Sequence, residues 1–384
     1  MRLGPGPFGG PPAGSPGGGR ADHVDDRKVD DRKKASGAQA TDGRRPSVNH
    51  TGVPKGRATA TSSRPRRSTA GGRPGGPVAG ALPWLAAAAV VAVQIPYPLL
   101  AAGGSGRAWL TAAQVLAFFT ASASHAARRR GWGFTARYLT LAVALGLLVE
   151  AAGLRTGWPF GRYAYTDGLG PEIVGVPVII PLAWSMMAYP ALLFGRHAAT
   201  AVSGTGVAVR AVTALVGGML LAGWDLFLDP RMIAEGFWAW APNDGPAVNG
   251  IPLTNTAGWL VVGALLVAVV DRVPGPTRGR GTAGGAIDVE HAGAAGPPAA
   301  GWPAGDGVPL LLVCWTYGSW LLACVAFFGQ PLVALTGGVG MGLPLLLAAV
   351  GGSRRWRTRA RAAAPARPQA RQELPDATSP DPPR

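Results

Sequence analysis

Long apolar runs set the strongest limit on what this chain can fold into. The 384 residues contain eight such runs, most of them about 17 to 22 residues long. About 20 apolar residues in a helix cross the hydrocarbon layer of a bilayer, and backbone groups in lipid must hydrogen-bond within their own segment. The sequence therefore predicts an all-α, polytopic integral membrane helix bundle with about eight (seven to eight) transmembrane helices. The predicted helices are 82–102, 108–126, 135–154, 174–194, 209–228, 256–271, 308–328 and 332–350, of which the sixth is short and the eighth contains Gly and Pro.

Two basic tails flank this predicted domain of residues 81–350. Residues 1–80 hold 15 Lys and Arg against 6 acids, and residues 351–384 hold 8 against 3, so the tails carry nearly all of the net charge of +16. Both contain few large apolar side chains, which is typical of disordered segments. Residues 273–306 are rich in Gly, Ala and Pro and are predicted to form a flexible cytoplasmic linker. Because no folded basic face accompanies the charge, a nucleic-acid partner is not expected.

Arginines alternate between the two ends of the predicted helices. Clusters precede the first helix, follow the second, fourth and sixth, and follow the eighth, whereas the opposite loops hold few. Cytoplasmic loops of membrane proteins carry an excess of Lys and Arg. The pattern therefore predicts a multi-pass protein of the cell membrane with both termini in the cytoplasm. Loops 155–175 and 229–255 would then share the non-cytoplasmic side.

Three acidic residues near those loops are the candidate catalytic groups. Glu150 and Asp225 each lie about one turn from the outer end of a predicted helix. Ionisable groups at such depth are costly and commonly functional, and removal from water would let a carboxyl keep its proton near neutral pH. The alternative role is a hydrogen bond to a neighbouring helix. Asp229 follows Asp225 by one helical turn, but Pro230 disfavours helix at the residue before it. We therefore expect this helix to end near 228, and Asp229 is as well suited to a structural pair with Arg231 as to catalysis.

Aromatic residues are dense along the same margin. Trp224, Trp238 and Trp240 could line a slot for an elongated apolar ligand or stabilise a cation through their ring faces. Trp158 and Trp259 are expected to belong to an aromatic belt at the membrane interface. The full set of candidate substrate-binding residues is Trp224, Trp238, Trp240, Trp184, Tyr163, Tyr165 and Asn255.

The remaining candidates have simpler expected roles. Trp184 is placed mid-membrane, where packing is the first expectation and a ligand wall the second. Thr254 and Asn255 begin the sixth helix and would cap its free N–H groups. Cys314 and Cys324 would lie about 15 Å apart along one helix, too far for a disulfide, and are expected to be packing residues. The five histidines are scattered, so no metal site is predicted.

Two blocks of motifs resemble one family. The first is Glu150 followed by PFGRYAY at 159–165 and GVPxxIPLAWxMMxYP at 175–190. The second is WDLFLDPRM at 224–232, GxWxW at 236–240 and GIPLTNxxGW at 250–259. Together they resemble the carotenoid biosynthesis membrane protein family, which includes acyclic-carotenoid hydratases of the bisanhydrobacterioruberin hydratase and gamma-carotene 1'-hydroxylase types. The resemblance covers about 82–350, and Val248 and Asn249 stand where an aromatic residue is expected.

The resemblance implies that water is added to the terminal C1–C2 double bond of an acyclic carotenoid, giving a tertiary alcohol without a cofactor. Asp225 or Glu150 would protonate the double bond, the motif tryptophans would shelter the cation, and the second carboxylate or Asp229 would activate the water. The implied partners are the bilayer, the carotenoid and other enzymes of its pathway. The competing hypothesis is a non-catalytic isoprenoid or lipid carrier or scaffold, and an enzyme acting on another isoprenoid is a third.

Overall fold

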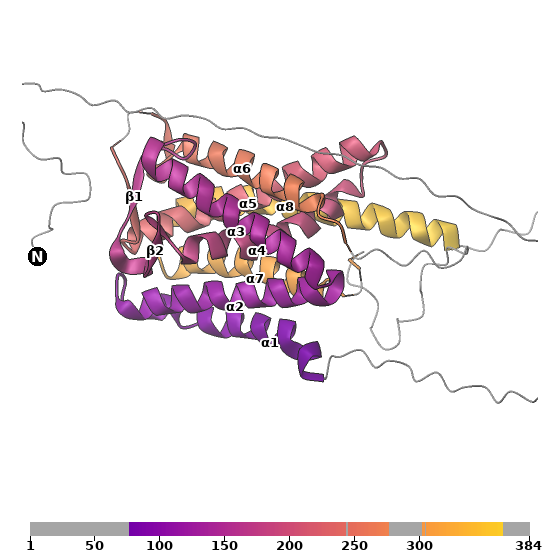
Figure 1. Cartoon of the computed structure of the whole chain (residues 1–384), viewed down its shortest axis with the longest axis horizontal. Coiled ribbons are helices and arrows are strands. Elements are labelled where there is room, and N and C mark those ends of the chain that lie inside the picture. The colour runs from indigo at the N-terminus through magenta and orange to yellow at the C-terminus, as the bar shows by residue number, and fades with distance from the viewer. Residues whose placement is uncertain (1–76, 243–244, 276–301, 304, 364–384) are drawn as a thin grey trace, which may run out of the picture. The chain divides into compact units, whose positions relative to one another are not determined.

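The computed structural model describes residues 77–242, 245–275, 302–303 and 305–363. Residues 1–76 of the predicted disordered segment 1–80, most of the predicted linker 273–306 and residues 364–384 lie outside this range. Eight long helices account for most of the described chain (Figure 1). They are α1 (Pro77–Gln94), α2 (Ser105–Arg130), α3 (Trp132–Thr156), α4 (Ile179–Ala199), α5 (Gly206–Ala234), α6 (Leu253–Asp271), α7 (Gly307–Ala326) and α8 (Pro331–Ala363).

The helices confirm the predicted membrane bundle. Among the described residues, six helices carry a stretch that is long and apolar enough to cross a membrane: α1, α3, α5, α6, α7 and α8. The other two, α2 and α4, are less apolar. Helix α4 is buried along almost its whole length, so it presents little surface that would need to be compatible with lipid. The chain is a multi-pass membrane protein.

Helix α5 packs closely against its neighbours through glycines. A Cβ atom on Gly218 would lie 2.6 Å from the backbone nitrogen of Ala264 on α6, and one on Gly217 would lie 2.8 Å from Val267. On another side of the helix, the Cα of Gly223 lies close to Gly340 on α8. Small residues allow helix backbones to approach one another in membranes. These contacts fix α5 between α6 and α8, next to α4.

The loops predicted at 155–175 and 229–255 meet in a small β-ribbon at one end of the bundle (Figure 1). Strand β1 (Tyr163–Tyr165), after α3, pairs antiparallel with β4 (Trp238–Trp240), after α5, so that Tyr163 faces Trp240 and Tyr165 faces Trp238. Two shorter ladders flank it: β2 (Glu172–Ile173) with β3 (Val176–Pro177), and β5 (Ala247–Val248) with β6 (Ile251–Pro252). The prediction that both loops lie at the same end of the bundle is therefore confirmed.

Several helix boundaries differ from the prediction, among them the start of α1 at Pro77, within the segment 1–80 that was predicted to be disordered. Helix α1 ends at Gln94 and gives way to the short 3-10 helix η1 (Tyr97–Leu99), because prolines at 96 and 98 remove backbone donors. Helix α8 continues to Ala363, into the segment predicted to be a tail. Asp271, the last residue of α6, accepts a hydrogen bond from Arg196 Nε at 2.7 Å.

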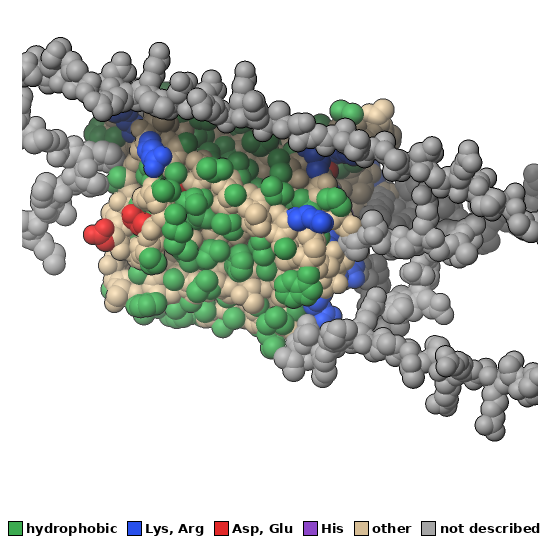
Figure 2. Space-filling view, viewed as in Figure 1, with side chains coloured by type: hydrophobic (Ala, Val, Ile, Leu, Met, Phe, Trp, Pro, Cys, Tyr) green, Lys and Arg blue, Asp and Glu red, His purple; other side chains and the backbone are tan. Residues whose placement is uncertain are grey.

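The visible face of the bundle is largely apolar. Hydrophobic side chains cover much of the surface between the two ends, and charged groups lie toward those ends (Figure 2). Exposed apolar side chains occur on most of the helices, among them Leu116, Leu148, Val261, Leu322 and Leu335. Many exposed apolar side chains between charged ends are typical of a protein surrounded by lipid.

Candidate active site

The centre of the site is a pair of carboxyl groups on α5. Asp225 and Asp229 lie one helical turn apart, and their exposed fractions are 1% and 4%. The amide nitrogen Nδ2 of Asn255, on α6, donates to Oδ2 of Asp225 at 2.8 Å and to Oδ2 of Asp229 at 2.6 Å. Since both oxygens bond the same nitrogen, the two carboxyl groups are adjacent. The expectation that Asn255 caps α6 was wrong: no side chain caps that helix, which begins after Pro252.

Asp229 reaches this position because α5 does not end near 228. The helix continues through Pro230 to Ala234. Proline removes one backbone hydrogen bond, and the bond from Asn255 to Asp229 is one of the tertiary contacts that hold this turn. Of the two roles considered for Asp229, the structural pair with Arg231 is not formed, since Arg231 contacts Glu235 instead.

A buried cluster of charged side chains lies next to this turn and was not predicted from the sequence. Glu235 contacts Arg231 through Oε1, which also accepts a hydrogen bond from Arg107 Nη1 at 2.5 Å. The second oxygen, Oε2, accepts from the backbone N–H of Gly103 at 2.8 Å. The guanidinium of Arg231 lies 3.9 Å from the ring centre of Phe328. The pairing of Glu235 with a residue on α2 fastens the end of α5 to α2.

Glu150, on α3, is the third buried carboxyl, and three donors converge on it. The Tyr163 hydroxyl donates to Oε2 at 2.5 Å and the Tyr165 hydroxyl donates to the same oxygen at 2.8 Å. The Trp184 indole donates to Oε1 at 2.9 Å. Burial, with Glu150 beside both phenols, raises the pKa of Tyr163 and of Tyr165, so both hydroxyls keep their protons and remain donors. This network holds the Glu150 carboxyl in one orientation.

Stacked aromatic rings form the walls around these carboxyls. Trp184 and Trp259 lie face to face, with ring centres 4.0 Å apart and planes inclined by 5°. Trp224 meets Trp259 edge-on at 5.9 Å, and Tyr163 stacks on Trp240 at 5.2 Å. The expectation that Trp259 belongs to an interfacial belt was wrong, because it is 7% exposed. Trp184 lies in the second turn of α4, near the site end of that helix.

Between the carboxyls and the rings lies a small chamber of about 40 Å³. A buried water needs about 10 to 15 Å³ of such volume and two or more polar partners, so the chamber can hold a few waters next to the acids. Of the residues predicted for the site, it brings together Glu150, Asp229, Asn255, Tyr163, Tyr165, Trp184, Trp238 and Trp240, with Phe160 and Trp259 added. Phe160 was not singled out, although it lies within the PFGRYAY motif. Trp224 and Asp225 adjoin the chamber through Trp259 and Asn255.

The electrostatics favour a proton held at the aspartate pair. None of the ion pairs found among the described residues involves Glu150, Asp225 or Asp229. A buried carboxylate without a cation is costly, and two adjacent carboxyls lower that cost by sharing one proton. Within the described part of the chain, Oδ1 of Asp225 is buried and has no hydrogen-bond partner. The arrangement can therefore supply a proton from one carboxyl and accept one at another.

Comparison with known proteins finds similarity in the same part of the chain. Residues 110–281 match the family model described as carotenoid biosynthesis protein. Bisanhydrobacterioruberin hydratase of Haloarcula japonica is 36% identical over 129 residues, which are 32% of this chain and 40% of the relative. The chain thus spans less than half of that relative's length, and no solved structure matches it. All the carboxyl and aromatic residues of the site lie within 110–281, the part of the chain that matches this family model.

Proposed function

We propose that this protein is a hydratase that adds water to the terminal C1–C2 double bond of an acyclic carotenoid. The observation that carries the proposal is the buried pair Asp225 and Asp229, bridged by Asn255 beside an aromatic chamber. The family model that residues 110–281 match and the name of the relative support the substrate class and the reaction. The reaction consumes only water, so no oxidant or reductant is needed.

The first step is protonation of the double bond. Asp225 gives the proton held by the aspartate pair to C2 of the carotenoid, through the oxygen Oδ1 that has no other partner among the described residues. The π electrons form the new C–H bond, and C1 becomes a tertiary carbocation. A positioned general acid of this kind contributes about 10² to 10⁴ in rate.

The aromatic walls stabilise the cation that follows. The face of a Trp or Tyr ring attracts a cation by about 0.5 to 2 kcal/mol, more where water is excluded. Trp184, Trp240 and Trp259 present rings to the chamber. They also limit the number of waters that can reach C1, which reduces side reactions of the carbocation.

The second step is attack by water on C1. A carboxylate of the cluster, Asp229 or Glu150, accepts the proton that the water loses as its oxygen bonds to C1. One proton leaves the cluster and one returns, so the net reaction is the addition of one water. Because Asp225 and Asp229 are adjacent, a proton accepted by Asp229 returns to the pair and restores the starting state.

We place the site on the non-cytoplasmic side of the cell membrane, with both termini in the cytoplasm, on the basis of the arginine pattern. Reporter fusions at residues 240 and 290 test this orientation. They should report opposite sides of the membrane, and the same side for both would contradict it.

The central test is expression in a lycopene-producing bacterium, with pigments analysed by mass spectrometry. The wild-type chain should add the mass of one water per modified end. Asp225→Asn should reduce product by at least about 100-fold while the protein stays in the membrane. Asp167→Asn is the matched control, since it makes the same chemical change at an exposed position of the same end. Full activity of Asp225→Asn would refute the proton-donor role.

A carrier without catalytic activity is the second candidate, and a large apolar cavity between α1, α2, α5 and α7 favours it. A carrier would bind the pigment and release it unchanged. Wild-type protein that co-purifies with lycopene but yields no hydrated product from several acyclic substrates would support the carrier instead of the hydratase.

A further inference from the structure

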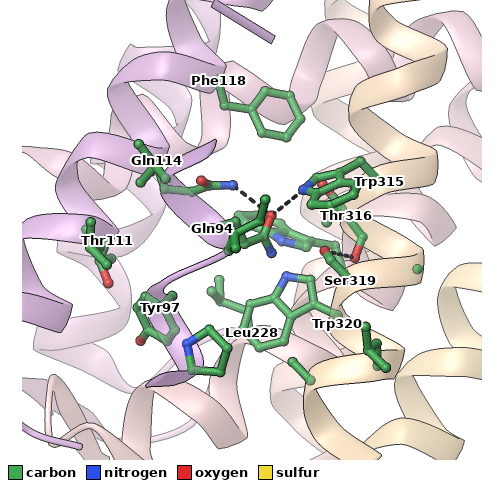
Figure 3. Close-up of a pocket in the computed structure, with 18 of the residues that line it drawn as sticks. Gln94, Tyr97, Thr111, Gln114, Phe118, Leu228, Trp315, Thr316, Ser319 and Trp320 are labelled. Carbon is green, nitrogen blue, oxygen red and sulfur yellow. Dashed lines mark hydrogen bonds between the residues drawn. The ribbon is translucent and has the colours of Figure 1, made fainter. Parts of the chain in front are cut away.

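A second cavity, much larger than the carboxyl chamber, lies outside it. It has a volume of about 420 Å³ and is bounded by α1, η1, α2, α5 and α7 (Figure 3). Pockets that hold small ligands have volumes of about 300 to 1,000 Å³. Its rim includes Ile95, Leu322 and Phe327, each more than half exposed on the apolar surface. The cavity therefore opens where lipid would surround the protein.

Helix α5 separates this cavity from the carboxyl chamber. Trp224, Leu228 and Met232 follow one another at four-residue spacing and line the cavity. Asp225 and Asp229 are each the next residue along, about 100° round the helix, and face Asn255 on α6. Leu228 borders both spaces. One leucine side chain is thus a partition between a large apolar cavity and the acids.

The two spaces differ in what they can hold. The chamber of about 40 Å³ has room for waters but not for a branched five-carbon end group, whereas the cavity is about ten times larger. A hydrocarbon that is to meet Asp225 must therefore lie mainly in the cavity and reach the acids by displacing Leu228.

Hydrogen bonds between helices keep the cavity wall in place. Gln94 is the last residue of α1. Its side-chain oxygen accepts hydrogen bonds from Gln114 Nε2 of α2 at 3.2 Å and from Trp315 Nε1 of α7 at 2.8 Å (Figure 3). The three side chains link three different helices around the cavity. Polar side chains that bond one another in an apolar surrounding resist separation, which opposes collapse of the space.

We propose that this cavity binds the apolar chain of an acyclic isoprenoid, and that Leu228 is the partition past which the end of the chain reaches Asp225 and Asp229. The proposal deepens the hydratase function. The role of Leu228 rests on that function, whereas the binding of the hydrocarbon in the cavity does not. The occupant is a hydrocarbon because the lining is mostly apolar, and it is the substrate because the cavity shares Leu228 with the chamber.

Gly318 of α7 offers a direct way to fill the cavity. It lines the space, and a Cβ atom placed on it would meet nothing within 4 Å. Gly318→Leu and Gly318→Phe should therefore occupy the cavity without striking the backbone. Val325→Phe is the matched control, because Val325 lies on the same helix, is 65% exposed and does not line the cavity.

The assay is quenching of tryptophan fluorescence by added lycopene in purified, detergent-solubilised protein. Trp224, Trp315 and Trp320 line the cavity and serve as reporters. All variants carry Asp225→Asn, so that binding is read without turnover. Gly318→Phe should weaken binding by about tenfold or more, because excluding one isoprene unit removes burial of several methyl and methylene groups. Gly318→Leu should weaken it less, and Val325→Phe should not change it.

The outcomes separate this proposal from the hydratase function. Unchanged lycopene binding by both Gly318 variants would overturn the cavity as the binding site and leave hydration untouched. The expected binding pattern without hydrated product in any host would support the cavity and refute the hydratase. If a phospholipid with brominated acyl chains quenches the same tryptophans and excess lycopene does not displace it, the occupant is a membrane lipid and the proposal is wrong.

Discussion

Removal of the hydroxyl of Tyr163 or Tyr165 should weaken the attachment of strand β1 to α3 and lower the stability of the protein. Both phenols donate to Oε2 of Glu150, at 2.5 and 2.8 Å. Phenylalanine keeps each ring, so the stacking of Tyr163 on Trp240 is preserved. The change then isolates one hydrogen bond to a buried carboxyl.

The size of the effect follows from the burial of the acceptor. A hydrogen bond contributes about 0.5 to 1.5 kcal/mol between neutral groups and about 1.5 to 3 kcal/mol when one partner is charged. Each Tyr→Phe substitution should therefore lower the free energy of unfolding by about 1 to 3 kcal/mol. For a domain of this size, a loss near 2 kcal/mol corresponds to a fall of about 4 to 8 °C in melting temperature. Both hydroxyls use the same oxygen, so the remaining donor partly compensates for each single loss, and the double variant should lose more than the sum of the single losses.

Thermal unfolding in one detergent at one pH measures these losses. Tyr138→Phe is the control, because the Tyr138 hydroxyl is buried and has no hydrogen-bond partner among the described residues. Its removal should be neutral or slightly stabilising. If Tyr163→Phe and Tyr165→Phe melt at the same temperature as Tyr138→Phe and the wild type, Glu150 is not held as described and the assignment of this network is wrong.

Three further predictions concern the supports of the site. Glu235→Gln leaves two buried arginines without their anion and should cost about 3 to 5 kcal/mol, visible as loss of folded protein after extraction; a wild-type yield would contradict the buried cluster. Gly218→Leu places a side chain against Ala264, where even a Cβ would lie 2.6 Å from the backbone nitrogen. It should lower the free energy of unfolding by more than the roughly 1 to 3 kcal/mol typical of an overpacked core position; normal folding would show that α5 and α6 are not in close contact. Above pH of about 10, unfolded tyrosines lose their protons while the buried phenols of Tyr163 and Tyr165, with raised pKa, keep them. Stability present below that pH is therefore lost as pH rises, by up to about 1.4 kcal/mol per pH unit for each tyrosine, and each Phe substitution should flatten the decline in urea or thermal titrations; an unchanged slope would mean that the phenols are not protected.

The sequence predicted the helices well because the length of an apolar run is a local property. All eight predicted runs coincide with helices, although α1 ends earlier and α8 ends later than expected. The shared end of the two motif loops also followed, because it depends only on the number of helices between them. The all-α description missed the ribbon between β1 and β4, whose strands are separated by more than 70 residues.

The partners inside the site could not be predicted, since each one joins distant parts of the chain. Asn255 has the sequence position of a helix cap, and only the packing of α6 on α5 turns it toward two aspartates, 26 and 30 residues away. Glu235 pairs with Arg107 across 128 residues. Pro230 misled the local argument about Asp229, because a preference worth one backbone hydrogen bond was outweighed by tertiary contacts of the same turn.

The division of α5 into two faces also limits which genetic changes this chain can tolerate. Inserting or deleting one residue in the helix between Gly206 and Trp224 would turn everything after it by about 100°. A deletion would turn the acids toward the cavity that now meets Trp224, Leu228 and Met232, and an insertion would turn them farther from it. Either change would move the acids away from Asn255. Single-residue length changes should therefore be absent from this part of the helix among functional descendants.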